Sequence, residues 1–110
     1  MNAGKSTALL QSNYNYLERG MKTLLFLPKV DAESNDGKIH SRIGLTADAH
    51  SVDTGFNFFH HVSQEHIKKS IDCILIDEVQ FLTKEQVKQI CKISDELNIP
   101  AMCYGIRTDF

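Results

Sequence analysis

The first residues of the chain are of the types that bind phosphate. Gly4, Lys5 and Ser6 match the end of the phosphate-binding loop pattern GxxxxGK[ST], whose backbone N–H groups surround phosphate oxygens. In such a loop the lysine reaches the terminal phosphates and the serine hydroxyl holds Mg²⁺. Short glycine-lysine-serine turns also arise by chance in surface loops, so the pattern needs an acidic partner elsewhere in the chain.

Asp77 and Glu78 supply such a partner. They follow the apolar segment Ile71–Ile76, which has the composition of a buried parallel strand that ends in a carboxylate. Asp77 suits a Mg²⁺ shell, and Glu78, which points in another direction, could accept a proton from a hydroxyl nucleophile. Glu78 could instead only cap a loop, and Phe81 could be either core or an aromatic surface for an acceptor base. Together these patterns predict a nucleoside-triphosphate site or its remnant.

A helix is expected to present the loop to its ligand. The spacing of Leu10, Tyr14 and Leu17 predicts a helix over residues 6–19, and Gly20 follows as its stop. Its amino end would direct free N–H groups and the positive end of the helix dipole at a bound phosphate.

Three apolar runs are predicted to be strands: Thr23–Leu27, Ile71–Ile76 and Ala101–Tyr104. The first of them, closed by Pro28, has the composition of a strand buried on both faces. One helix is predicted over 62–70, and another from a capping box at Thr83 and Gln86 to Leu97, with Asn98 and Pro100 ending it. The buried side of this last helix is predicted to carry Val87, Ile90, Cys91 and Leu97. The alternation predicts an α/β fold, a parallel sheet with flanking helices and ligands at the carboxyl ends of its strands.

The segment 28–55 is polar and lacks periodicity, so it is predicted to be a long flexible loop or flap. Loops of this length in a compact domain are usually functional or disordered, which draws attention to Asp31, Ser41 and Arg42.

Composition limits the class of protein. A single domain of 110 residues with a formal charge of −2 has no basic field for nucleic acid, which is therefore not an expected partner. Cys73, Cys91 and Cys103 show no paired spacing and are predicted to be buried free thiols of a cytoplasmic protein. No long apolar span predicts a membrane segment. The three histidines of the segment 60–66, namely His60, His61 and His66, are predicted to lie on the surface or to cap, rather than to bind a metal.

Several segments resemble thymidine kinases of the bacterial and cellular zinc-containing type (type II). They are Met1–Thr7, Tyr14–Tyr16, Glu18–Met21, Ser41–Leu45, Asp77–Thr83, Asn98–Pro100 and Cys103–Phe110. The resemblance covers nearly the whole chain and implies a P-loop core of the RecA-like kind. It also implies transfer of the terminal phosphoryl group of ATP to the 5′-hydroxyl of thymidine, a step of nucleotide salvage for DNA synthesis.

The resemblance further assigns residues. ATP would be contacted by Met1, Asn2, Ala3, Gly4, Lys5 and Ser6 and by Asp77, Glu78, Val79 and Gln80. Ser6 and Asp77 would hold Mg²⁺, and Glu78 would be the catalytic proton acceptor. Phe81 and Phe110 would lie near the nucleoside. A homotetramer is implied as the assembly.

The chain also departs from this family. A first strand and a carboxyl-terminal zinc lobe have no counterpart, so residues 1–110 are predicted to be a partial kinase domain without a zinc site, prone to associate along open sheet edges. Glu33 stands where related sequences commonly carry an arginine. Three interpretations stay open: a thymidine kinase cut short or completed by another polypeptide, an inactive remnant, and another P-loop ATPase in which Glu78 activates water.

Overall fold

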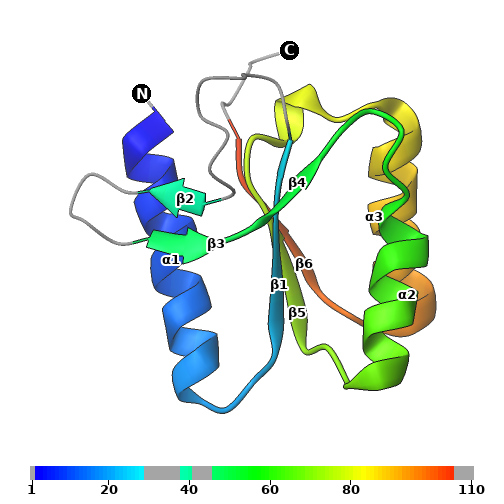
Figure 1. Ribbon diagram of the computed structural model, residues 1–110, viewed down its shortest axis with the longest axis horizontal. Coiled ribbons are helices and arrows are strands. Elements are labelled where there is room, and N and C mark those ends of the chain that lie inside the picture. The colour runs from blue at the N-terminus through cyan, green and yellow to red at the C-terminus, as the bar shows by residue number, and fades with distance from the viewer. Residues whose placement is uncertain (1, 29–37, 41–45, 106–110) are drawn as a thin grey trace.

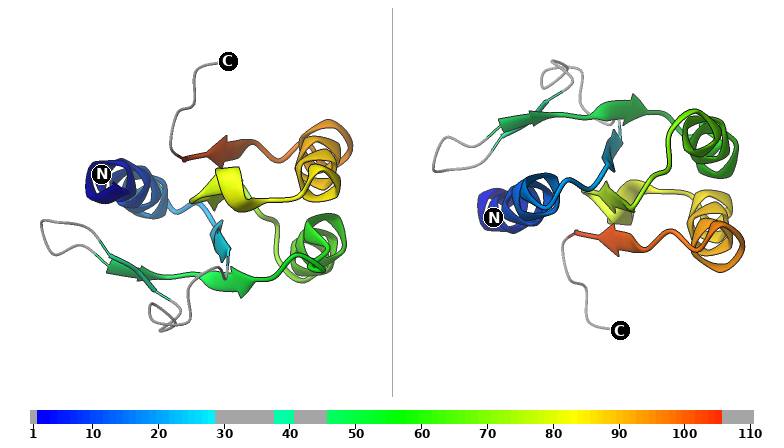
Figure 2. Two further views of the ribbon diagram at one scale, coloured as in Figure 1. Left: turned by 90° about the horizontal axis from the view of Figure 1, so that it is seen from above. Right: turned by 90° about the horizontal axis from the view of Figure 1, so that it is seen from below.

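The computed structural model describes residues 2–28, 38–40 and 46–105, with the backbone alone described for 2–7, 38–40 and 46. Its elements are α1 (Asn2–Glu18), β1 (Thr23–Pro28), β2 (Lys38–His40), β3 (Thr46–Asp48), β4 (His50–Val52), α2 (Phe58–Lys68), β5 (Cys73–Ile76), the 3₁₀ turn η2 (Val79–Phe81), α3 (Lys84–Leu97) and β6 (Ala101–Cys103). A sheet in the order β4-β1-β5-β6 separates α1 from α2 and α3 (Figures 1 and 2).

All pairings in this sheet are parallel, which confirms the predicted α/β fold. Thr23 pairs with Cys73 and Ile76 pairs with Cys103, so β1, β5 and β6 end at the same edge. The amino end of α1 lies at that edge too, at the top of Figure 1. The strands therefore bring their carboxyl ends to the end of the molecule where α1 begins.

The sheet has a hydrophobic core on each face, because successive strand residues point to opposite sides. Phe26, Ile74 and Ile76 pack against α2 and α3. Leu25 and Leu75 pack against the other face with residues of α1. This two-sided burial explains why the central strands are continuous apolar runs rather than alternating ones.

The packed stripe of α1 differs from the predicted one. Leu10 is buried as expected, but Tyr14 and Leu17 are 59% and 51% exposed, and the buried positions are instead Leu9 and Asn13. Asn13 is buried because its Oδ1 accepts a 2.5 Å hydrogen bond from the Thr23 hydroxyl of β1. Apolar spacing alone could not set the rotation of the helix, since polar Asn13 belongs to its buried stripe.

The end of α1 was predicted correctly. Gly20 has a φ of +79°, and its N–H donates to Leu17 O at 3.0 Å. Met21 N–H donates to Tyr16 O at 3.0 Å, which completes a Schellman motif. Glycine is suited to this position because a side chain disfavours a positive φ.

The prediction of an irregular segment over 28–55 was wrong in part. It contains β2 and β3, which form an antiparallel pair, and β4, which extends the main sheet beside β1. Each of these strands has three residues, too few for a periodic pattern to emerge in the sequence. Asp31, Glu33, Ser41 and Arg42 lie outside the described residues.

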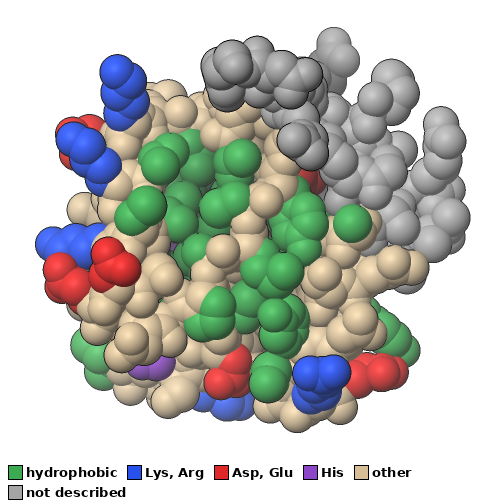
Figure 3. All heavy atoms as spheres, turned by 180° about the vertical axis from the view of Figure 1, so that it is seen from behind, with side chains coloured by type: hydrophobic (Ala, Val, Ile, Leu, Met, Phe, Trp, Pro, Cys, Tyr) green, Lys and Arg blue, Asp and Glu red, His purple; other side chains and the backbone are tan. Residues whose placement is uncertain are grey.

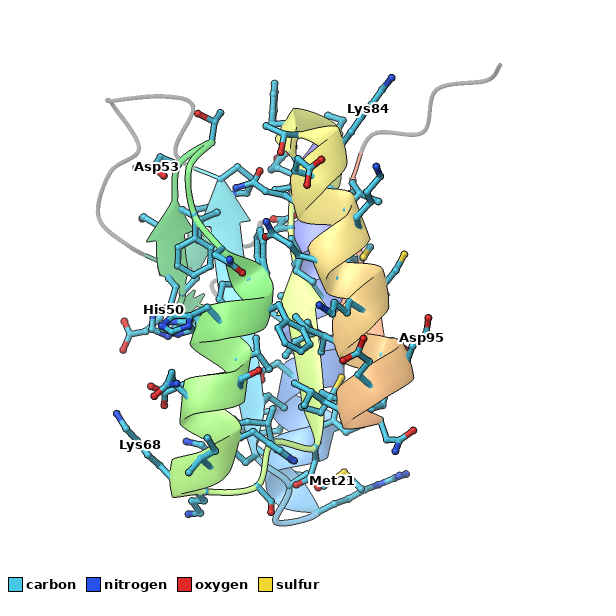
Figure 4. The ribbon with its side chains drawn as sticks, turned by 90° about the vertical axis from the view of Figure 1, so that its right-hand side faces the viewer. Met21, His50, Asp53, Lys68, Lys84 and Asp95 are labelled. Atoms are coloured by element: carbon cyan, nitrogen blue, oxygen red, sulfur yellow. The ribbon has the colours of Figure 1, made fainter. Side chains whose placement is uncertain are left out.

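Figure 4 shows α2 and α3 side by side over the sheet, with Asp53 and Lys84 at the end where the strands finish and Met21 at the opposite end. The start of α2 is Phe58, four residues earlier than predicted, because Asn57 caps it by accepting from His60 N–H at 2.9 Å. The capping box of Thr83 and Gln86 and the end of α3 at Asn98 are confirmed.

Two details of α3 and β6 correct the sequence analysis. Ile90 is buried as predicted, but Val87 is 46% exposed and Cys91 is exposed, because the helix packs through Gln86, Ile90 and Ile93.

Cys73 is buried, whereas Cys103 is exposed on the edge strand β6. Figure 3 shows apolar side chains gathered on the face where β6 forms this edge. Association along the edge stays a prediction.

Candidate active site

Asp77 stands at the carboxyl end of the central strand β5. Its N–H donates to Phe26 O at 3.0 Å, which extends the β1–β5 ladder by one residue beyond the strand. The side chain is 2% exposed, and its Oδ1 accepts a 2.9 Å hydrogen bond from the N–H of Glu78. The sheet thus fixes a buried carboxylate at the edge toward which α1 begins, as the sequence predicts.

Glu78 turns the chain away from the strand. Its φ of 53° and ψ of 45° place it in the left-handed region, which costs a residue with a side chain about 1–2 kcal/mol. The next residues form η2, so the two adjacent carboxylates leave the backbone in different surroundings. The Glu78 Oε1 accepts a 2.6 Å hydrogen bond from Gln80 Nε2. Strained backbone of this kind is common where function requires one particular side-chain direction.

Tyr104, which follows β6, is hydrogen-bonded to the segment around this turn. Val79 N–H donates to Tyr104 O at 2.9 Å, and Tyr104 N–H donates to Ile76 O at 2.8 Å. The Tyr104 hydroxyl donates to Ser12 Oγ of α1 at 3.1 Å. Tyr104 therefore joins the ends of β5 and β6 to α1. Sequence analysis did not identify this role, because all three hydrogen bonds link residues distant in sequence.

Phe81 is 47% exposed, so the interpretation as an ordinary core residue is wrong. It lies at the end of η2 beside a cavity of about 20 Å³, lined by Pro28, Val52, Asp53, Thr54, Phe81, Leu82 and Gln86. This space could hold about one water molecule and is too small for a nucleobase. A base would have to lie against the exposed part of the ring. Phe110, its predicted companion, lies outside the described residues.

Gln86 holds the segment that leads from β4 to α2. It is 2% exposed, and its Oε1 accepts from Thr83 N–H at 3.1 Å, as the capping box requires. Its Nε2 also donates to Asp53 O at 2.7 Å and to Phe56 O at 3.2 Å. The capping box could be read from the sequence, but these contacts across about thirty positions could not.

Residues 2–5, predicted to belong to the loop before the first helix, instead form the first turn of α1. Asn2, Ala3, Gly4 and Lys5 are helical, whereas the helix was predicted to start at Ser6. Alanine and lysine are good helix formers, and regular helical hydrogen bonding can extend through them. The first four N–H groups of a helix have no partner within it, so an anion can still be bound at this end. The side chains of Asn2, Ala3, Lys5 and Ser6 are not described, and Met1 lies outside the described residues.

The three histidines of segment 60–66 have different environments. His60 is exposed, and His66 Nδ1 accepts from Ile71 N–H at 2.9 Å, which agrees with a surface and a capping role. His61 instead packs against His50, with ring centroids 4.6 Å apart, and its Nε2 is buried without a hydrogen-bond partner. Burial lowers the pKa of His61, and the neighbouring His50 lowers it further.

Two wider cavities lie away from Asp77 and Glu78. One, of about 520 Å³, is at the amino ends of the strands and is lined by Leu17, Gly20, Met21, Lys22, Thr23, Lys69, Ser70 and Asp72. The other, of about 370 Å³, lies between α1 and the β1 and β3 strands. In open parallel sheets ligands bind at the carboxyl ends of the strands, so topology favours the Asp77 edge over either cavity.

A Mg²⁺ site would need donors from two parts of the chain. The buried carboxylate of Asp77 is a hard oxygen ligand of the type that Mg²⁺ prefers, held at the edge where α1 begins. Phosphate oxygens and water usually complete such a shell, so one or two protein ligands suffice. In the described part of the chain no group of three histidine, cysteine, aspartate or glutamate side chains could hold a metal by itself.

Comparison with known proteins gives a consistent result. The model of the family "Thymidine kinase" matches residues 1–110. Over 110 residues the chain is 54% identical to a thymidine kinase of Yersinia pestis, 56% to one of Colwellia psychrerythraea and 49% to one of Escherichia coli K12. These matches cover 100% of the chain and 56%, 57% and 54% of the three relatives. The chain therefore spans about half the length of the curated relatives it matches.

Within the described residues, no helix has the length and apolar character needed to cross a membrane.

Proposed function

The chain belongs to the thymidine kinase family, and on that premise we propose that its protein transfers the terminal phosphoryl group of ATP to the 5′-hydroxyl of thymidine. The observation that carries the proposal is the arrangement of two adjacent carboxylates at one sheet edge. Asp77 is buried and continues the strand, while Glu78 is turned away by its left-handed backbone. The amino end of α1 lies at the same edge.

Each part of this edge has a role in the proposed reaction. The N–H groups at the start of α1 and the Lys5 ammonium would hold the phosphates of ATP. Asp77 and the Ser6 hydroxyl would hold Mg²⁺, which neutralises charge on the phosphates when it is bound. Val79 and Gln80 belong to the same proposed nucleotide-contacting segment, and Phe81 would lie against the base of the nucleoside.

Glu78 would act on the acceptor. The 5′-oxygen of thymidine forms the new bond to the terminal phosphorus, the bond from that phosphorus to the departing ADP oxygen breaks, and the hydroxyl proton passes to the Glu78 carboxylate. A positioned general base contributes about 10²- to 10⁴-fold to a rate. Most of the remaining acceleration would come from alignment of the two substrates and charge neutralisation.

The family resemblance extends the proposal to the setting of the reaction. We propose a homo-oligomer, with a tetramer as the form that the resemblance implies, acting in the cytoplasm on ATP and thymidine without a nucleic-acid partner. Size-exclusion chromatography with light scattering would check the assembly, and a monomer at all concentrations would contradict it.

Transfer of labelled phosphate from ATP to thymidine tests the function. Glu78→Gln keeps the size of the side chain and removes the proton acceptor, so we expect kcat to fall about 10²- to 10⁴-fold. Lys5→Ala should abolish measurable transfer by removing phosphate contacts. Glu85→Gln and Lys88→Ala are the matched controls, because both residues are exposed on α3.

Two outcomes would reject the proposal. ATP hydrolysis that needs no nucleoside, and that Glu78→Gln abolishes, would indicate an ATPase in which Glu78 activates water. A folded chain that forms no thymidine monophosphate would show that these residues keep the sequence of a kinase without its activity.

A further inference from the structure

We propose that Gln80 is a positioning residue for the Glu78 carboxylate, and that Gly105 is a glycine because only glycine leaves room for Gln80 to do this. The inference rests on the proposed function, since it is there that Glu78 accepts a proton. It gives Gln80 a role different from the ATP contact implied by the family resemblance.

The first observation is the contact between the two side chains. Gln80 Nε2 donates to Glu78 Oε1 at 2.6 Å, although Gln80 is an exposed residue. Glu78 precedes η2 in a left-handed conformation, and Gln80 is the middle residue of that turn. An amide donor orients a carboxylate without bringing a full positive charge to it, as a lysine or arginine would.

The second observation is the close approach of Gly105 to η2. A Cβ atom on Gly105 would lie 2.5 Å from Gln80 Oε1, 2.9 Å from Val79 Cγ2 and 3.2 Å from the backbone nitrogen of Val79. The two segments cannot easily separate, because Val79 N–H donates to Tyr104 O at 2.9 Å. The Gln80 side chain is the more flexible neighbour, so an alanine at position 105 would displace it first and draw its amide away from Glu78.

Space, rather than backbone conformation, is what requires glycine here. Among the described glycines only Gly20 has a positive φ, so Gly105 has a backbone conformation that other residues can adopt. Gly55 shows the contrast, because a Cβ atom there would meet only Asp53 Oδ1 at 3.6 Å, which is an ordinary contact. Gly55→Ala is therefore the matched control for Gly105→Ala.

Steady-state kinetics separates the two roles of Gln80. If Gln80 positions Glu78, Gln80→Ala should lower kcat by about 10- to 100-fold, a part of the contribution of a general base, and leave the KM for ATP and thymidine within about twofold. Gly105→Ala should have the same effect on kcat, and Gly55→Ala should have none. If Gln80 instead contacts ATP, the KM for ATP would rise with kcat unchanged, and the proposal would be overturned.

A double-mutant cycle tests the link between Gly105 and Gln80. Once Gln80 has been replaced by alanine, the extra Cβ at position 105 has no amide to displace and meets only Val79 Cγ2 at 2.9 Å and Val79 N at 3.2 Å. Gly105→Ala should therefore lower kcat by a clearly smaller factor in that background than in the parent. Losses that multiply in the double variant would show that Gly105 acts through Val79 and the backbone, and would contradict the proposal.

The side-chain contact can be measured without catalysis. In ¹H–¹⁵N spectra the side-chain amide signals of Gln80 should move in Glu78→Gln and in Gly105→Ala, and stay in place in Glu65→Gln, a change on the distant helix α2. If the Gln80 amide signals do not move in Glu78→Gln, the inference is overturned, whether or not the chain transfers phosphate to thymidine. Signals that move as expected in a chain without kinase activity would leave the contact in place and reject the proposed function instead.

Discussion

The adjacent residues Asp77 and Glu78 have different backbone conformations. Asp77 continues the β-ladder and is 2% exposed, whereas Glu78 takes a φ of 53°, a conformation that disfavours side chains other than those of asparagine and aspartate. The two carboxylates also have different hydrogen-bond donors, because Asp77 Oδ1 accepts from Glu78 N–H and Glu78 Oε1 accepts from Gln80 Nε2. The sequence predicted that the two carboxylates follow the strand and point in different directions, but not the left-handed turn at Glu78.

This strain predicts a conflict between stability and activity at Glu78. Asparagine tolerates the left-handed region better, so Glu78→Asn should raise the free energy of unfolding by about 0.5–1 kcal/mol while transfer to thymidine is lost. Urea unfolding followed by circular dichroism measures the change. Glu85→Asn, in the first turn of α3, is the control and should not stabilise. A Glu78→Asn variant that is less stable than the parent would contradict this explanation of the turn.

His61 predicts a pH dependence of stability. Its pKa is lowered in the folded chain, first by burial and then by His50. As pH falls below about 6.5, the unfolded chain binds a proton on this ring before the folded chain does, which favours unfolding. The contribution of His61 to the free energy of unfolding is therefore fully present above about pH 6.5 and is lost as pH falls toward the lowered pKa of His61 in the folded chain.

Thermal unfolding between about pH 7.5 and about pH 5.5 checks this prediction. Tm should fall with pH, and His61→Asn should reduce the slope. His60→Gln, a change of an exposed neighbour whose charge also lowers the pKa of His61 but less than burial and His50 do, should reduce the slope much less than His61→Asn. A slope that persists in His61→Asn would assign the pH dependence to other groups.

At the scale of elements, local chemistry was easier to predict than tertiary contact. The capping box at Thr83 and the glycine stop at Gly20 were predicted because a few neighbouring residues determine them. The short strand β4 was not predicted, because its place in the sheet depends on pairing with β1. The rotation of α1 was missed for a related reason, since the buried Asn13 finds its hydrogen-bond partner in Thr23 of β1.

The link between α3 and the segment after β4 gives a test at this scale. Gln86→Ala removes three hydrogen bonds of a buried side chain and leaves the Asp53 and Phe56 carbonyls without this donor. We expect a loss of about 2–3 kcal/mol in the free energy of unfolding. Lys88→Ala, on the exposed side of the same helix, should change it by less than about 0.5 kcal/mol. Equal effects of the two changes would show that Gln86 does not hold this segment.

At the scale of the whole molecule, the parallel sheet brings the carboxyl ends of its strands to one edge, where ligands usually bind in such folds. β1, β5 and β6 end beside the start of α1, while the cavity of about 520 Å³ lies at the amino ends of the strands. The predicted order of helices and strands was sufficient to identify the carboxyl edge as the candidate site. The position of β6 as an edge strand follows from strand order, which the sequence pattern alone does not determine.

The location of the bound nucleotide tests this account most directly. Mn²⁺ can replace Mg²⁺ beside ATP, and its unpaired electrons broaden the NMR signals of nearby amides. We expect Mn²⁺–ATP to broaden the amide signals of Asp77 and Glu78 and those of the first turn of α1, and to spare Lys22 and Asp72 at the opposite edge. Broadening centred on Lys22 and Asp72, with Asp77 unaffected, would place the nucleotide at the amino ends of the strands and contradict the account.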